Sequence, residues 1–179
     1  DEAVKFHASR FGAHPAGMWP SEEGVSEHII PFFLQAGINW IVTDEAILFK
    51  SLKKKTRDAH LLYQPHKCKR KEGDLTIVFR DRNLSDILSF VYHAWRPEDA
   101  AADFMKHLKH ISEAFNHDDF LVTVAMDGEN AWEYFANDGH DFLNALYQKL
   151  SEADFVQTTT VNDYLRTHIV ESEIKKLEP

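Results

Sequence analysis

Cysteine is almost absent from this sequence, since Cys68 is the only one among 179 residues. An intrachain disulfide and a zinc site built from several cysteines are therefore excluded. Long apolar runs are missing too, because none approaches the roughly 20 residues that a membrane-spanning helix needs. No signal peptide is visible. Because nothing requires an oxidising compartment, we expect a cytoplasmic protein with no membrane partner, while a secreted parent protein stays open.

Positive charge is also scarce. The chain has 20 Lys and Arg against 29 Asp and Glu, which gives a formal net charge of −9. A nucleic-acid partner needs clustered Lys and Arg to neutralise phosphates, so we expect none. The two basic stretches, Lys53–Arg57 and Lys67–Lys71, fit solvated loop or helix-end charge better than a binding patch.

Motifs for phosphate binding and for serine or cysteine nucleophiles are missing. There is no Gly-rich phosphate loop, and no Ser or Cys lies in a nucleophile elbow. A metal site is conceivable among His107, His110, His117, Asp118 and Asp119. Two lysines on the same predicted helix favour a solvated face instead. We therefore expect neither a metal nor an organic cofactor.

Short apolar runs alternate with stretches of helical periodicity. The apolar runs predict strands at 16–19, 38–42, 61–63, 75–79, 120–126 and 155–160. Helices are predicted at 4–11, 21–37, 43–52, from 83 or 85 onward, from 97 onward, at 130–150 with a break near 137–139, and at 162–166. We expect segment 67–73 to be a loop, and the tail 171–179 to be helical or frayed. This alternation favours an α/β fold with a parallel sheet or barrel.

The first candidate functional residue is Glu22, which follows Trp19 and Pro20 at the end of a predicted strand. A carboxylate there lies near a helix N-terminus, whose dipole helps to keep it ionised. An ionised carboxylate is what a nucleophile must be. The alternative is that Glu22 and Glu23 only neutralise the first helical turn.

The second candidate is Asp81, which lies between Arg80 and Arg82 after the strand predicted at 75–79. A general acid needs a raised pKa, and two neighbouring cations oppose this unless they point elsewhere. A structural ion pair is therefore an equal alternative for Asp81. Asp86, which has the sequence context of a helix start, is the other candidate in this segment.

A third acidic cluster, Asp127 and Glu129, follows the strand predicted at 120–126, with Gly128 between them for a sharp turn. These carboxylates suit the binding of sugar hydroxyls, and Asp127 also suits a catalytic role. Alternatively, Asp127 or Asn130 caps the next helix. Carboxylates at the carboxyl ends of barrel strands are a common arrangement for cleaving sugars. Of the tryptophans, we expect Trp19 to form a wall for sugar stacking, and Trp95 and Trp132 to serve packing.

Four segments together resemble glycoside hydrolase family 57, which groups prokaryotic α-amylases, amylopullulanases, 4-α-glucanotransferases and α-glucan branching enzymes. They are Gly17–Glu22 with Val25–Glu27, Ala36–Glu45, Phe79–Asp86 and Asp127–Glu133, and the resemblance extends from about Phe6 to Leu165. The first is similar to the region of the nucleophilic glutamate, spaced Trp-x-x-Glu. The third is similar to the region of the acid/base aspartate, and the last to the final conserved region. Glu23 stands where a small residue is expected.

The resemblance implies a catalytic domain that is an incomplete (β/α)7 barrel with parallel strands. Residues 1–179 would be its middle and later part, with the upstream strands lying before Asp1. It implies a retaining glycosidase or transglycosidase acting on α-glucans or maltooligosaccharides, although this fragment alone is expected to be inactive if half the site is missing. Glu22 would be the nucleophile and Asp81 the acid/base. Trp19, Arg80, Asp127 and Glu129 would bind substrate.

Two other functions stay open from the sequence. One is a metal-dependent hydrolase on a related barrel, such as a polysaccharide deacetylase or an α-mannosidase, in which Asp127 and histidines supply ligands. The other is a carbohydrate-binding fragment without catalysis. Linkage specificity, the balance of hydrolysis and transfer, and oligomeric state are not encoded in any motif that we find.

Overall fold

The computed structural model describes residues 1–115, 119–129 and 131–179. The chain divides into two compact units. The first, here called the sheet unit, comprises Asp1–Asp81, Leu121–Thr123 and Val161–Pro179. The second, here called the helical unit, comprises Arg82–Phe120 and Val124–Thr160.

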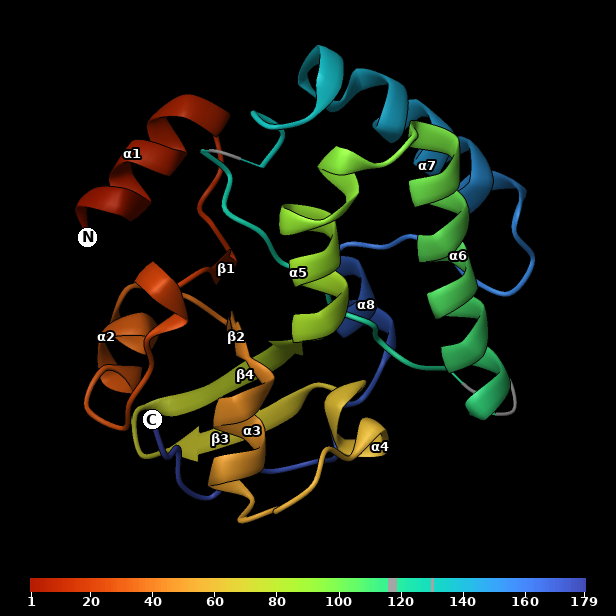
Figure 1. Ribbon diagram of the computed structural model, residues 1–179. Coiled ribbons are helices and arrows are strands. Elements are labelled where there is room, and N and C mark those ends of the chain that lie inside the picture. The colour runs from red at the N-terminus through yellow and green to blue at the C-terminus, as the bar shows by residue number, and fades with distance from the viewer. Residues whose placement is uncertain (116–118, 130) are drawn as a thin grey trace. The chain divides into compact units, whose positions relative to one another are not determined.

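The sheet unit is built on four strands in the order β1-β2-β4-β3 (Figure 1). The strands are β1 (Gly17–Met18), β2 (Trp40–Asp44), β3 (His66–Arg70) and β4 (Gly73–Arg80). β1 pairs with β2 and β2 with β4 in parallel, whereas β3 pairs with β4 as an antiparallel hairpin. The predicted α/β class is therefore confirmed. Because β1, β2 and β4 are parallel, their carboxyl ends lie at one edge of the sheet.

The parallel strands are where the apolar runs predicted them. β2 buries its residues from Ile41 to Asp44, and β4 buries Leu75 and the run Ile77–Phe79. Near-continuous burial of this kind is typical of strands that are covered on both faces. β1 approaches β2 closely, because a Cβ on Gly17 would lie 1.9 Å from the Trp40 ring. Only glycine fits at that position.

Short helices complete the sheet unit. They are α1 (Glu2–Phe11), the 3₁₀ helix η1 (Ser21–Glu23), α2 (Ile30–Gln35), α3 (Glu45–Ser51), α4 (Ala59–Leu62) and α8 (Val161–Thr167). α1 ends at Gly12 in the left-handed conformation, as predicted. α3 begins at Asp44, whose carboxylate accepts a hydrogen bond from the N–H of Ala46 at 2.8 Å. α8 is tied to the sheet through Asn162, which accepts a hydrogen bond from the Trp40 indole at 2.6 Å.

Several predictions for the sheet unit were wrong. Segment 67–73 is not a loop, because 67–70 belong to β3, which buries Cys68 while the flanking lysines point outward. Segment 61–63 is not a strand but overlaps α4. Segment 21–37 is not one helix, because η1 and α2 are separated by 24–29. The tail is neither helical nor frayed, since it forms a parallel bridge from Glu173 to Lys67 and buries Ile174 and Leu177.

The helical unit contains α5 (Arg82–Phe90), η2 (Tyr92–Ala94), α6 (Pro97–Ala114), η3 (Ala136–Gly139) and α7 (His140–Glu152). α6 begins at Pro97, where the missing N–H of proline costs nothing. α6 and α7 lie side by side (Figure 1). Trp132 packs against Phe135 and Phe142 with ring centroids 5.4 and 6.1 Å apart, which agrees with the packing role predicted for it.

Three predictions for residues 120–160 also need correction. Segment 120–126 is extended but forms only an isolated bridge, from Thr123 to Arg80. Segment 155–160 is not a strand. The helix predicted from 130 begins only at His140, after the break that was predicted near 137–139. Pattern alone could not separate extended chain from strand, because a strand also requires a partner.

None of the helices in the described ranges combines the length and the apolar character that crossing a membrane requires.

His66 gives the sheet unit a pH-dependent stability. Its side chain is fully buried, with Nε2 2.7 Å from the Leu61 carbonyl and Nδ1 2.8 Å from the Ser172 hydroxyl. Because a carbonyl only accepts, Nε2 donates and Nδ1 accepts from Ser172, which is the pattern of a neutral imidazole. Burial lowers the pKa of His66 below its ordinary value, although the hydrogen bond to Leu61 opposes this.

We predict that the free energy of unfolding falls as pH decreases through and below about 6.5, the ordinary pKa of histidine. In that range the unfolded chain binds a proton that the folded chain resists, so acid favours unfolding. Urea denaturation at several pH values measures the slope. His66→Gln should flatten it, whereas His28→Gln, at an exposed histidine, should not. Equal slopes in all three proteins would contradict the role of His66.

Candidate active site

Glu22 follows β1 and lies in η1, at the edge of the sheet where the parallel strands end. Its side chain is exposed, and no hydrogen bond or ion pair to its carboxylate is found within the described ranges. The turn is closed by hydrogen bonds from the Glu23 N–H to Pro20 O at 2.9 Å and from the Gly24 N–H to Ser21 O at 3.0 Å. The structure therefore presents Glu22 as a solvent-accessible carboxylate.

The backbone at Glu22 is strained. Glu22 has φ 50° and Glu23 has φ 58°, so two successive residues other than glycine adopt the left-handed conformation. Each such residue costs roughly 1 kcal/mol relative to ordinary backbone conformations. Strain of this kind persists only where surrounding contacts hold the chain in place.

The contacts that hold this turn come from Arg80 and Thr43. Arg80 Nε lies 2.8 Å from Glu23 Oε1 and 3.1 Å from Asp44 Oδ2, so one guanidinium bridges two carboxylates. The hydroxyl of Thr43, at the end of β2, donates to the carbonyl of Glu23 at 2.6 Å. Arg80 was predicted to bind substrate. The structure shows it between Glu23 and Asp44, joining the ends of β2 and β4 to η1.

Asp81 is almost fully buried, and its carboxylate pairs with Arg57. Its Oδ2 lies 2.7 Å from Arg57 Nη2 and accepts the phenolic O–H of Tyr63 at 2.6 Å. The N–H of Asp81 donates to the carbonyl of Thr123 at 2.8 Å, which fixes the backbone as well. The structural ion pair that the sequence left open for Asp81 is therefore present, but its cation is Arg57.

Arg57 and its partners have perturbed pKa values. Burial lowers the pKa of Arg57, but the hydrogen bond to Tyr63 and the charge of Asp81 outweigh it and raise the pKa overall. Burial and the hydrogen bond to Asp81 raise the pKa of Tyr63. Burial also raises the pKa of Glu45, whose carboxylate lies 3.1 Å from Arg57 Nε, although Arg57 opposes this. The cluster thus holds a permanent cation between Glu45 and Asp81.

Arg57 was not predicted as a site residue, because it belongs to a basic stretch that was interpreted as solvated. That interpretation holds for Lys54, whose pair with Asp58 is largely exposed. The feature that distinguishes Arg57 is a partner 24 residues away in the chain, which no local pattern reveals.

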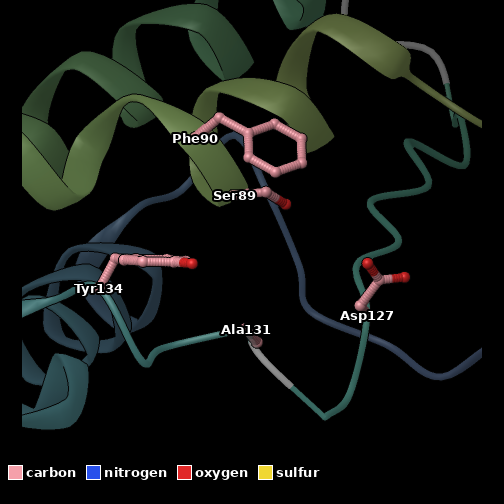
Figure 2. Close-up of a pocket in the computed structure, with 5 residues that line it drawn as sticks. All are labelled: Ser89, Phe90, Asp127, Ala131 and Tyr134. Carbon is pink, nitrogen blue, oxygen red and sulfur yellow. The ribbon is translucent and has the colours of Figure 1, made fainter.

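Asp127 lies in the helical unit, beside a shallow surface hollow that is open to solvent. Figure 2 shows Ser89 and Phe90 above this hollow, Ala131 below it, and Tyr134 and Asp127 at its left and right. The rings of Phe90 and Tyr134 are each 70% exposed. An apolar ring face beside a hydroxyl and a carboxylate suits a polyhydroxylated ligand, because sugars offer both C–H and O–H groups.

The segment that carries Asp127 is fixed to α5 at one point. The N–H of Ala125 donates to the fully buried hydroxyl of Ser85 at 3.2 Å. Ser85 lies one helical turn before Ser89, so this bond holds the extended segment beside the helix that supplies the other wall of the hollow. Glu129, the other predicted ligand, is exposed, and Asn130 lies outside the described residues.

The remaining predicted residues are placed as follows. Trp19 is half-buried directly after β1, and Asp86 is half-buried on α5. His117 and Asp118, two of the conceivable metal ligands, lie outside the described residues. Elsewhere in the described ranges, no group of three His, Cys, Asp or Glu side chains is placed to hold a metal ion. Cys68 is buried, which raises the pKa of its thiol to about 11 and makes it a poor nucleophile.

We predict that Arg57→Met lowers the free energy of unfolding by about 2 kcal/mol, because the buried carboxylate of Asp81 loses its cation. The figure is below that for a fully buried pair, since the Arg57 side chain is 36% exposed. Lys54→Met is the matched control. It removes a pair whose side chains are 47% and 33% exposed, and should cost less than about 0.5 kcal/mol. Similar costs in urea denaturation would contradict a structural role for Arg57.

Several solved structures share this fold. The chain matches 4-alpha-glucanotransferase from Thermococcus litoralis with a TM-score of 0.75 and 18% identity, over 98% of this chain and 26% of that one. It matches an alpha-amylase from Thermotoga maritima with a TM-score of 0.75 and 12% identity, over 97% of this chain and 45% of that one. It matches a branching enzyme from Pyrococcus horikoshii with a TM-score of 0.75 and 14% identity, over 98% of this chain and 42% of that one.

At these identities the matches establish fold, and they confirm the predicted α/β barrel class. The chain spans between about a quarter and under half of the length of these enzymes. Comparison with curated protein sequences finds no match. A sequence model of the family described as Glycosyl hydrolase family 57, however, matches residues 2–176. This match extends over almost the whole chain, so the chain belongs to glycosyl hydrolase family 57.

Proposed function

We propose that the protein containing this chain is a retaining glycoside hydrolase or transglycosidase that acts on α-glucans. The observation that carries the proposal is Glu22, an exposed carboxylate in a strained turn at the carboxyl edge of a parallel sheet. Membership of the family and the names of the structural relatives support the substrate class. Strain and exposure in one carboxylate are expected of a reacting group rather than of packing.

In the proposed reaction, the Glu22 carboxylate attacks the anomeric carbon and forms a covalent glycosyl-enzyme. A second carboxyl group protonates the leaving glycosidic oxygen, then removes a proton from water or an acceptor sugar as the ester is displaced. A retaining enzyme needs these two carboxyl groups roughly 5–5.5 Å apart. Whether water or a sugar accepts the glycosyl group decides between hydrolysis and transfer.

Asp81 remains the prediction from sequence for the second carboxyl group, but its contacts suit a different task. Its Oδ2 is buried and already holds Arg57 at 2.7 Å and the O–H of Tyr63 at 2.6 Å, which are structural contacts. A general acid must instead come within hydrogen-bond reach of the glycosidic oxygen of a bound substrate. Asp127 is exposed beside the hollow in the helical unit and is free of such a cation among its lining residues. We therefore propose Asp127 as the stronger candidate for the proton donor.

The chemistry of the side chains around the hollow beside Asp127 supports a surface contact with a sugar. Phe90 and Tyr134 offer exposed ring faces for C–H surfaces, while Ser89 and Asp127 offer polar atoms for hydroxyls (Figure 2). Such a mixture is common in sites that combine apolar contact with a few placed polar groups. In the sheet unit, we propose that half-buried Trp19, three residues before Glu22, offers another ring face to the sugar.

The first test replaces Glu22 by Gln in the full-length protein and measures release of sugar from maltooligosaccharides. Loss of the nucleophile should reduce turnover by at least about 10⁴-fold, because no covalent intermediate can form. Glu72→Gln, at an exposed glutamate in the hairpin of β3 and β4, is the control and should leave turnover unchanged. The first-formed product should be the α-anomer by NMR.

One result would move the nucleophile, and two would overturn the function. Full activity in Glu22→Gln would assign the nucleophile to another residue, and loss of activity with a chelator would indicate a metal-dependent hydrolase. Binding of maltooligosaccharide by the wild-type protein without turnover would indicate a carbohydrate-binding role.

The second test compares Asp81→Asn with Asp127→Asn on two substrates. The leaving oxygen of an α-glucan must be protonated. In an aryl glucoside with an acidic phenol, the phenolate leaves without protonation. Loss of the true acid should reduce turnover of the glucan by about 10²–10⁴-fold. It should slow formation of the glycosyl-enzyme from the aryl glucoside far less. We expect this selective pattern in Asp127→Asn, and in Asp81→Asn an equal loss on both substrates together with lower stability. The reverse assignment would return the acid/base role to Asp81.

A further inference from the structure

Glu23 is unusual for its place in the sequence. It follows the proposed nucleophile directly, in a left-handed conformation that favours glycine, yet its side chain is only 12% exposed. Glutamate is costly there on two counts, because the backbone is strained and a carboxylate is largely removed from water. A residue that costs stability at a functional turn calls for a compensating contact.

The compensating contacts hold Glu23 at both its side chain and its backbone. Arg80 Nε approaches the carboxylate at 2.8 Å, and Thr43 donates its hydroxyl to the carbonyl at 2.6 Å. Arg80 is itself held by Asp44 at 3.1 Å, and Asp44 also accepts the N–H that begins α3. Thr43, Asp44 and Arg80 all lie at the ends of β2 and β4, and these two strands pair in parallel from Trp40 to Asp44.

We propose that Glu23 is a positioning residue that fixes the Glu22 carboxylate for attack, and that Thr43 and Arg80 are its anchors. This inference rests on the proposed role of Glu22 as nucleophile. The backbone on either side of Glu22 is held by contacts. After Glu22, Glu23 is anchored; before it, the carbonyls of Pro20 and Ser21 accept the hydrogen bonds that close the turn. The exposed Glu22 side chain has no partner of its own in the described ranges, so the backbone must set its direction. Reaction rates depend steeply on such alignment.

The experiment uses the full-length protein with Glu23→Gln, Thr43→Val and Thr43→Ser. Glu23→Gln keeps the shape of the side chain but removes its charge. Thr43→Val removes the hydroxyl, and Thr43→Ser keeps it. Glu27→Gln is the matched control, because it breaks another ion pair of the sheet unit, with Arg70 at 2.6 Å, that does not hold the turn.

Hydrogen exchange of the Glu23 and Gly24 amides, measured without substrate, tests the anchor itself. Both amides should exchange faster in Glu23→Gln and Thr43→Val than in the wild type, and Thr43→Ser should restore the wild-type rate. Unchanged exchange in Glu23→Gln and Thr43→Val would overturn the positioning role, whatever the activity.

Steady-state kinetics on a maltooligosaccharide tests the catalytic consequence. Glu23→Gln and Thr43→Val should lower kcat by at least about tenfold while KM changes by less than about twofold, because misalignment affects attack more than binding. Thr43→Ser should restore kcat, and Glu27→Gln should leave it within about twofold even if it lowers Tm. A loosened turn with unchanged kcat in an active enzyme would overturn the inference. An inactive wild type would overturn the proposed function instead, while the exchange data would still decide whether Glu23 anchors the turn.

Glu23→Gly separates anchoring from strain. Glycine relieves the left-handed backbone but deletes the carboxylate that Arg80 holds. If anchoring dominates, Glu23→Gly exchanges faster at Gly24 and turns over more slowly than the wild type. Higher turnover in Glu23→Gly would show that Glu23 contributes only strain, and would overturn the positioning role.

Discussion

The parallel pairing of β1, β2 and β4 is the constraint on which the candidate site depends. It brings three chain segments to one edge of the sheet, and each carries carboxylates: Glu22 and Glu23, Asp44 and Glu45, and Asp81. So many negative charges at one edge repel each other unless cations lie among them. Arg80 and Arg57 meet this requirement, each by bridging two carboxylates. The edge is thus a network in which charge balance and backbone geometry are set together.

The network leaves one carboxylate available. Glu23, Asp44, Glu45 and Asp81 all lie within 3.2 Å of an arginine nitrogen, whereas Glu22 faces solvent. Carboxylates that pair with arginines and a solvent-exposed one therefore share an edge but differ in environment, which leaves Glu22 available for the nucleophilic role that we propose. The ion pairs also hold the backbone together, since Arg80 links the ends of β2 and β4 to the turn after β1.

Features fixed by short-range pattern were predictable from the sequence. Buried runs located β2 and β4, Gly12 ended α1, and Asp44 and Pro97 marked helix starts. Features that depend on distant partners were not. β3 is polar except for Cys68, a composition typical of a loop, and only its pairing with β4 makes it a strand. Segment 120–126 has the composition of a strand but only one bridge. Likewise, the sequence indicated Asp81 as a candidate acid/base, but only the fold revealed that it pairs with Arg57.

The tail from Ser172 also affects the behaviour of the sheet edge. β3 is the last strand in the order, and an outer strand with open N–H and C=O groups is a template for pairing with other chains. Here Lys67 donates to Ser172 O at 2.8 Å and accepts from the Ile174 N–H at 2.9 Å. Because these bonds involve only the main chain, the tail can diverge in sequence and still shield the edge, provided that Ile174 and Leu177 remain apolar. The tail therefore covers part of the outer edge of β3, and its loss would expose these main-chain groups to pairing with other chains.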